Sequence, residues 1–107
     1  QDARPLVQRA MLIDPFHPRA RVGQGVVRAL EGDLGGSIDE LERLTARYPE
    51  AYDGFMFAGM LSLEDNDETR ALRNLKRYVE LAPASEQPPM MRVAVKQLEE
   101  KLAAPQP

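Results

Sequence analysis

The sequence repeats itself at a constant interval. Three prolines, Pro15, Pro49 and Pro83, are evenly spaced, since 49 minus 15 and 83 minus 49 both equal 34. Gly25 and Gly59 keep one distance to the proline that follows them, since 49 minus 25 and 83 minus 59 both equal 24. Other pairs at the proline interval are Ser37 with Ala71, Leu41 with Leu75 and Leu44 with Tyr78, and the offsets lead upstream to Ala3, Val7 and Ala10. Such a period predicts stacked copies of one unit, because a single copy is too small to bury its own apolar face.

The repeat resembles the tetratricopeptide (TPR) family, whose 34-residue unit has two short helices, a small residue inside each helix and a closing proline. The residues that carry the resemblance are Phe55, Ala58, Gly59, Ala71, Leu75 and Pro83 in the later copy and Gly25, Gly32, Asp33, Leu41 and Pro49 in the earlier one. The resemblance implies an all-α fold, an α-solenoid of antiparallel helix pairs with about six helices in a right-handed superhelix. It also implies one domain over residues 1–104, with a half-repeat (1–17), two repeats (18–51 and 52–85) and a closing helix (88–103), and a tail at 105–107.

Composition favours one small, folded and soluble domain. The chain has 107 residues, of which 43% are hydrophobic and 29% charged. No apolar run approaches the roughly 20 residues that span a bilayer, so we expect no direct membrane insertion. Cysteine is absent, which excludes disulfides but leaves the compartment open between the cytoplasm and the periplasm, as a domain of a longer protein. Eleven arginines against three lysines favour a bacterial source.

Charge is segregated along the chain. Residues 1–30 carry five arginines and two aspartates, a net charge of +3; residues 31–68 carry eleven acids and two arginines, a net charge of -9; and residues 69–107 return to +3. Faces of opposite charge would favour docking onto another copy or onto a partner of mixed charge, and the alternative is that these are solvated helix faces. Nucleic acid is not expected as a partner, because the basic residues are neither dense nor interleaved with aromatic ones.

Apolar periodicity predicts the positions of the helices. It indicates helices over residues 5–13, 19–31, 38–48, 51–63 and 90–102, and another that begins near Glu68. The helix over 51–63 is the most apolar and is expected to form the centre of the core. Gly59 within it costs about 1 kcal/mol of helix propensity relative to alanine, which suggests that a neighbouring helix passes close to it.

Turn and cap residues predict where two of these helices begin. Gly32 and Asp33 are expected to form a turn, because glycine accepts a left-handed backbone at a helix end. The predicted capping boxes are Ser37 with Glu40 and Asp65 with Glu68.

The helix over residues 19–31 departs from the family pattern. Arg21, Gln24 and Arg28 occupy the side that normally packs within a repeat, and they share one helix face at i, i+3 and i+7. The apolar side is formed instead by Val22, Val26, Val27 and Leu30. Either the helix is rotated, or its polar face meets solvent or a partner, in which case Arg19, Arg21, Gln24 and Arg28 are candidate polar contacts.

In TPR proteins the first helices of successive repeats line a concave groove that receives a peptide or a helix. Carried over by position, the resemblance implies a groove floor of Val22, Val26, Ala29, Met56, Met60, Leu63, Met90 and Ala94. Methionine adapts to irregular apolar partners, so an amphipathic helix or an apolar peptide is the expected ligand. The competing interpretation is that these methionines are ordinary core residues.

The function expected from the sequence is therefore a non-catalytic adaptor that binds a protein or peptide. The alternative is a structural module that oligomerises, or extends a longer array, through an open edge at Leu6, Val7 and Met11. The single histidine, His17, lies between Phe16 and Pro18 without converging partners, and no nucleophile–base pair or metal-ligand spacing is present, so no catalytic residue, cofactor or metal is expected.

Overall fold

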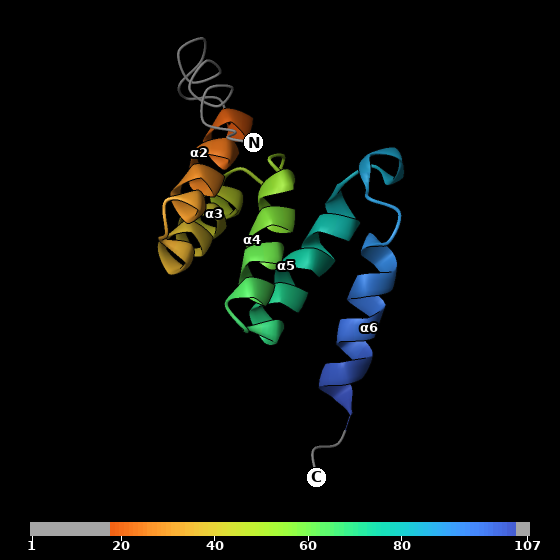
Figure 1. The fold of residues 1–107 in the computed structure, drawn as a ribbon. Coiled ribbons are helices and arrows are strands. Elements are labelled where there is room, and N and C mark those ends of the chain that lie inside the picture. Colours follow the sequence, from red (N-terminus) through yellow and green to blue (C-terminus); the bar gives the residue numbers. More distant parts are fainter. Residues whose placement is uncertain (1–17, 105–107) are drawn as a thin grey trace.

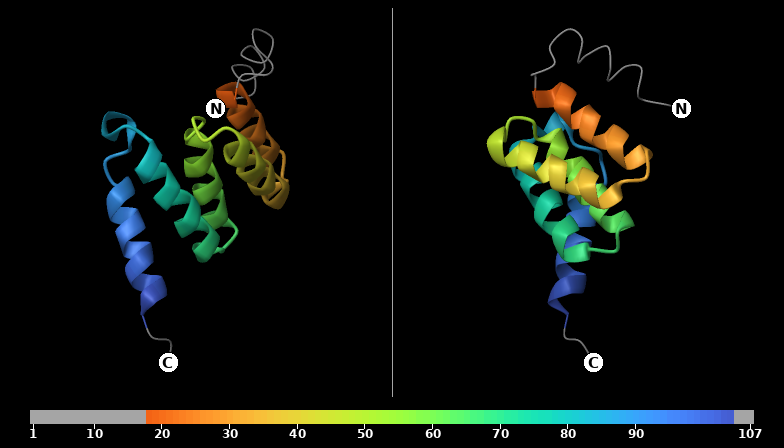
Figure 2. Two further views of the ribbon diagram at one scale, coloured as in Figure 1. Left: turned by 180° about the vertical axis from the view of Figure 1, so that it is seen from behind. Right: turned by 90° about the vertical axis from the view of Figure 1, so that its left-hand side faces the viewer.

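The computed structural model describes residues 18–104, and this part of the chain is all-α, without a strand (Figure 1). Its helices are α2 (Pro18–Leu30), α3 (Leu34–Arg47), α4 (Asp53–Glu64), α5 (Glu68–Leu81) and α6 (Met91–Ala103), with a short 3-10 helix, η1 (Ala84–Glu86), before α6. Consecutive helices run in opposite directions and each packs against the next, as the views in Figure 2 also show. The predicted helix over 5–13, with Leu6, Val7 and Met11, lies outside the described residues, as do His17 and the tail.

The period of the sequence reappears in the boundaries of the helices. α3 and α5 begin at Leu34 and Glu68 and end at Arg47 and Leu81, so the two starts and the two ends are separated by the same interval as the prolines. The turns before them match as well, because Gly32 and Asn66 both adopt a positive φ, of 98° and 60°. The interval of the sequence therefore recurs in the boundaries of α3 and α5 and in the turns before them.

The two capping boxes expected from the sequence are wrong. The N-cap residues are Asp33 and Asp67, whose side chains accept hydrogen bonds from the backbone N–H groups of Gly36 and Arg70, each at 3.0 Å. Aspartate at the N-cap satisfies an amide that has no partner within the helix. The two caps keep the interval of the prolines, since 67 minus 33 is 34, and α3 begins at Leu34 instead of the predicted residue 38.

Ser37, which we expected to cap α3, is instead part of its buried face. The Ser37 hydroxyl donates a hydrogen bond of 2.6 Å to the backbone carbonyl oxygen of Gly25 on α2. A Cβ atom added to Gly25 would lie 2.9 Å from Cδ2 of Leu41, and one added to Gly59 would lie 2.6 Å from Cδ2 of Leu75. The expectation that a helix passes close to Gly59 is confirmed, because both glycines let a leucine of the paired helix approach the backbone.

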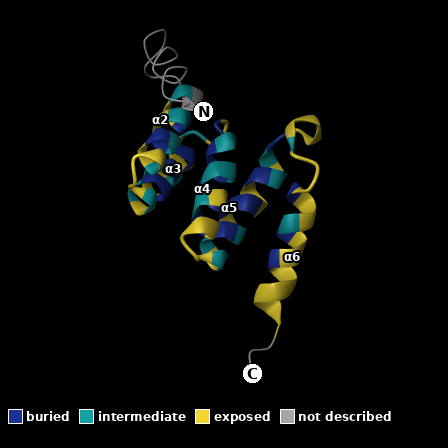
Figure 3. Ribbon diagram, in the orientation of Figure 1, coloured by how far each residue is buried: buried dark blue, intermediate teal, exposed yellow. Residues whose placement is uncertain are grey.

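The core consists of two apolar clusters that meet on α4. The first cluster contains Phe55, Leu75, Tyr78, Ala82, Met91, Val95 and Leu98, and the second contains Val22, Leu41, Leu44, Ala51 and Ala58. Since Phe55 and Ala58 belong to different clusters, α4 packs against its neighbours on two sides, as expected for the centre of the core. Figure 3 shows buried positions between neighbouring helices, while the turn between α4 and α5 and much of α6 are exposed. Leu41 is completely buried, and such a side chain contributes about 1.5 to 3 kcal/mol.

The closing helix α6 covers α5 but does not continue the period. Its buried residues include Met91, Val95 and Leu98, as expected, whereas Leu102 is 37% exposed. Phe55 is the first residue of α4 in the first core cluster, and Met91 is the first residue of α6 in it. The interval between these two residues is 36 and not 34. The register of the repeat therefore ends near Pro83. No helix among residues 18–104 is long and apolar enough to cross a membrane.

Candidate functional site

An apolar stripe on α4 is the most exposed part of the expected groove. Met56, Met60 and Leu63 follow one another at i, i+4 and i+7, so they share one side of the helix. Met60 is 48% exposed and Leu63 is 40% exposed, whereas Met56 is half-buried and packs against the first core cluster. Met60 is therefore not an ordinary core residue, and Met56 joins the stripe to the core.

The stripe faces outward because the other sides of α4 are occupied. Phe55 and Gly59 lie on the side that packs against α5, and Ala58 belongs to the cluster shared with α2 and α3. Gly54 completes this second contact, since a Cβ atom added to it would lie 2.5 Å from Cγ2 of Thr45 on α3. Only the remaining side of α4 is open to a partner.

On α2 the expected groove residues are less accessible than those on α4. Val22 is only 3% exposed and belongs to the second core cluster, so it is a core residue and not an accessible part of the floor. Val26 and Ala29 are half-buried. Leu30, which was not included in the expected groove, is 61% exposed, and its spacing of i+4 from Val26 is the signal that would have found it.

The part of the expected groove on α6 lies apart from the stripe on α4. Met90 is 66% exposed at the N-cap of α6, and Ala94 is half-buried one turn further on. α6 packs against α5, while α2 contacts α4 directly. The helices α2 and α4 are therefore in contact, whereas Met90 and Ala94 belong to a helix that packs against α5.

Two pockets lie near the stack of helices, and neither is lined by the stripe. The first, of about 500 Å³, lies between α2 and α3, and the second, of about 370 Å³, lies among α3, α4 and α5. In the second pocket the Phe55 ring is covered by the guanidinium of Arg77, 5.6 Å from the ring centre. The stripe is thus an open surface and not an enclosed cleft.

The polar residues expected on α2 lie in different surroundings. Arg21 and Gln24 are exposed and line the first pocket. The Arg28 guanidinium lies 2.7 Å from the Asp33 carboxylate, and this hydrogen bond is the main reason why the pKa of Asp33 is lowered and that of Arg28 raised. The side chain of Arg19 lies outside the described residues. The polar side of α2 is therefore exposed, while Val22 and Val27 on its apolar side are buried.

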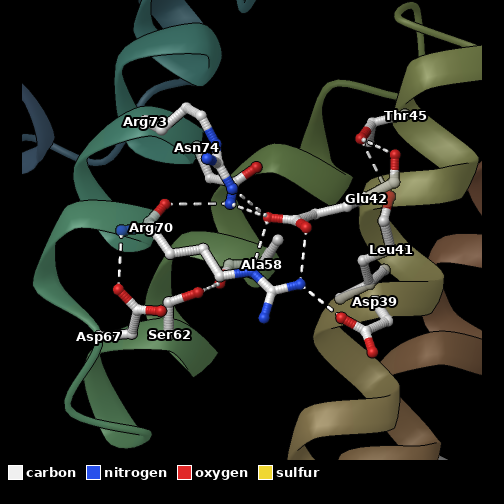
Figure 4. A network of polar contacts seen from close by, with 10 residues as sticks. All are labelled: Asp39, Leu41, Glu42, Thr45, Ala58, Ser62, Asp67, Arg70, Arg73 and Asn74. Atoms are coloured by element: carbon white, nitrogen blue, oxygen red, sulfur yellow. Dashed lines mark hydrogen bonds and ion pairs between the residues drawn. The ribbon is translucent and has the colours of Figure 1, made fainter.

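A network of charged residues joins α3 to α5 (Figure 4). Arg70 on α5 donates to Glu42 at 2.6 and 2.9 Å and to Asp39 at 2.5 Å, and both acids lie on α3. Asn74 also donates to Glu42, at 2.8 Å. The hydrogen bonds from Arg70 are the largest cause of the lowered pKa of Glu42, about 2, and the same contacts raise the pKa of Arg70.

Sequence reasoning did not find this network, although its signal was present. The acidic segment 31–68 and the basic segment 69–107 were interpreted as surfaces for docking or as solvated faces. In the structure the acids of α3 pair with arginines of α5 within the same chain, and Lys76 on α5 lies 3.2 Å from Glu99 on α6. Much of the charge segregation therefore stabilises the stacking of helices.

The described part of the chain places no group of three or more histidine, cysteine, aspartate or glutamate side chains where they would hold a metal ion. Its buried side-chain polar atoms are all hydrogen-bonded, including the Ser62 hydroxyl, which donates to the Ala58 carbonyl oxygen at 2.7 Å. The geometry thus draws attention to the surfaces of the stack and not to an interior site.

The fold defines an all-α protein in which consecutive antiparallel helices pack against one another. Comparison with protein-family models and with curated proteins gives no significant match.

Proposed function

We propose that this chain is a TPR-like repeat module that binds another protein through the stripe formed by Met56, Met60 and Leu63 on α4. The constant interval between Pro15, Pro49 and Pro83 supports the repeat assignment, together with N-caps at the same spacing on α3 and α5. The observation that carries the binding proposal is the exposure of Met60 and Leu63, 48% and 40%, on a helix whose other sides are packed.

The partner that suits this stripe is an amphipathic helix with apolar anchors on one face. A stripe at i, i+4 and i+7 presents a straight apolar row along α4, and a helix presents a matching row at the same spacing. Methionine fits partners of varied shape because its side chain is unbranched and polarisable. Helix α2, which contacts α4, also carries half-buried Val26 and exposed Leu30.

The strength of this interaction is limited by the size of the stripe. Complete burial of an apolar side chain contributes about 1.5 to 3 kcal/mol, so burying the exposed half of one contributes about 1 kcal/mol. Four such contacts give about 4 kcal/mol, close to a millimolar dissociation constant, before ordering costs are subtracted. A tighter complex therefore needs polar contacts as well.

The test is a selection of helical peptides on the whole chain, followed by measurement of their affinity by fluorescence anisotropy. Met60→Glu and Leu63→Glu are expected to weaken the selected peptides at least tenfold, because each places a charge in the apolar contact. Leu102→Glu is the matched control, since Leu102 is an exposed leucine on α6, outside the stripe. Thermal melts of each variant establish that the fold is retained.

Equal affinity of the selected peptides for wild type and Met60→Glu would contradict the proposal. So would a selection that enriches no peptide above background. Sedimentation of the same samples separates binding of a partner from self-association, which predicts a mass that rises with protein concentration.

A further inference from the structure

The apolar stripe on α4 ends beside two acidic residues. Glu64 is the last residue of α4 and follows Met60 at i+4, so the two side chains lie on the same side of the helix. Asp65 is the C-cap residue of α4, and both acids are exposed where the chain turns towards α5 (Figure 3). A partner that covers Met60 therefore comes close to two carboxylates.

These two carboxylates lie at the negative end of the α4 dipole. The C-terminus of a helix carries a partial negative charge, so a cation is favoured there and a carboxylate is not. The last turn of α4 contains no basic residue. On α2, in contrast, Arg28 lies in the last turn and pairs with Asp33 at 2.7 Å. The end of α4 therefore has a negative charge that its own helix does not compensate.

The other acids of the same turn already have partners. Asp67 accepts a hydrogen bond from a backbone N–H group as the N-cap of α5, and Glu68 pairs with Lys101 on α6 at 2.7 Å. Within residues 18–104, Glu64 and Asp65 form no ion pair. Their charge is therefore available to a cationic group that arrives with a partner.

The apolar stripe and the two acids together select one kind of helix. Exposed Met60 and Leu63 suit apolar anchors on one face of a partner helix. A lysine or arginine one turn beyond those anchors would lie close to Glu64 and Asp65, because side chains one turn apart share a helix face. An acidic helix or an anionic membrane surface would instead bring like charges together, which is unfavourable.

We propose that the partner of the stripe is a cationic amphipathic helix, whose apolar anchors cover Met60 and Leu63 and whose lysine or arginine reaches Glu64 and Asp65. This inference rests on the proposed function, because it names the chemistry of the partner that the stripe would bind. Charges at the edge of an apolar contact act mainly on the association rate and on specificity. They also supply the polar contacts that a tighter complex needs.

The test compares three fluorescent, alanine-based helical peptides, whose binding to the whole chain is measured by anisotropy. All three carry leucines at i, i+4 and i+7, and the positions one turn further, i+8 and i+11, hold lysine, glutamine or glutamate. At low ionic strength we expect the lysine peptide to bind about fivefold more tightly than the glutamine peptide, and the glutamate peptide to bind most weakly. Added salt should reduce these differences.

A double variant, Glu64→Gln with Asp65→Asn, removes both charges and keeps the size of the side chains. It should lose most of the preference for the lysine peptide and bind the glutamine peptide as wild type does. The matched control is Glu100→Gln, since Glu100 is an exposed acid on α6, outside the stripe, and this variant should keep the preference. Thermal melts of each variant establish that the fold is retained.

The outcomes separate this inference from the proposed function. Equal affinities of the lysine and glutamine peptides for wild type, with both weakened by Met60→Gln, would overturn the cationic partner and leave the stripe as a binding surface. So would a preference for lysine that persists in the double variant or is lost in Glu100→Gln.

Other outcomes would contradict the stripe and the inference together. These are no binding of any peptide at millimolar concentration, and binding of the lysine peptide that Met60→Gln does not weaken. Sedimentation of the chain alone tests a second copy as the rival occupant, because self-association that Met60→Gln abolishes would overturn a partner helix as the ligand.

Discussion

The two helix pairs, α2–α3 and α4–α5, share a framework and differ in the surface that they present. Both have a glycine on the first helix against a leucine on the second, Gly25 with Leu41 and Gly59 with Leu75. One helical turn before these glycines the two pairs differ. Arg21 on α2 is exposed, whereas Phe55, at the equivalent position on α4, is buried. The comparison shows that the two pairs share the glycine–leucine contact between their helices, whereas an equivalent position on the first helix is exposed in one pair and buried in the other.

The largest expected effect comes from this divergent position. Phe55→Ala should lower the free energy of unfolding by about 3 to 5 kcal/mol, because it leaves a cavity in the first core cluster. Arg21→Ala should change it by about 0.5 kcal/mol or less, since the side chain is exposed. Urea denaturation of both variants checks the pair of values. Similar losses in the two variants would mean that Arg21 is as buried in solution as Phe55.

The charged network is expected to have the next largest effect. Glu42→Gln should lower the free energy of unfolding at neutral pH by about 1 to 2 kcal/mol, because Arg70 and Asn74 lose a charged acceptor. Glu99→Gln is the matched control: the Lys76–Glu99 pair is about half exposed, so about 0.5 kcal/mol or less is expected.

The same network should make stability depend on pH. The pKa of Glu42 is lowered from 4.5 to about 2 in the folded protein. A carboxyl group with a lower pKa in the folded state stabilises the fold above its unfolded pKa, and this contribution is lost as the pH falls from about 4.5 to about 2. Denaturation at several pH values should show a smaller loss for Glu42→Gln than for wild type over this range. If the free energies of unfolding of wild type and Glu42→Gln changed in parallel with pH, Glu42 would not contribute to the loss of stability in acid.

The glycine contacts should give a smaller and graded effect. Gly59→Ala gains about 1 kcal/mol of helix propensity but places a Cβ atom 2.6 Å from Leu75 and 3.2 Å from the Ala71 carbonyl oxygen. We expect a net loss of about 1 to 2 kcal/mol, because the backbone atom cannot move aside. Gly25→Ala meets side-chain atoms first, Cδ2 and Cγ of Leu41 at 2.9 and 3.1 Å, so a loss below about 1 kcal/mol is expected. Thermal melts should rank the two variants in this order, and the reverse order would contradict the explanation.

The two N-caps should have a small effect that is similar in both helix pairs. Asp67→Ala removes the N-cap of α5 and should cost about 1 kcal/mol, whereas Asp67→Asn should keep most of the stability. Asp33→Ala should lower the melting temperature in the same direction, because it removes the equivalent cap of α3. A cap that matters in one pair and not in the other would show that the equivalence of the pairs is limited to their boundaries.

Part of the candidate site was predictable and part was not. The α4 stripe was carried over by position from the family resemblance, and Met60 and Leu63, two of its three residues, are exposed. The burial of Val22 did not follow from spacing, since it depends on the approach of α4 to α2. The position of Arg21 and Gln24 in a pocket with Arg43 also required the packing of α2 on α3.

The sequence alone determined that residues 18–104 are all-α, where most of their helices lie and that another helix passes close to Gly59. These features depend on helical periodicity and on contacts between neighbouring helices, and both leave a regular trace in the chain. The tertiary structure decided which charges pair and how the closing helix is placed. Glu42 pairs with Arg70 on another helix, and α6 packs against α5, because both contacts depend on distances in space that no local pattern encodes.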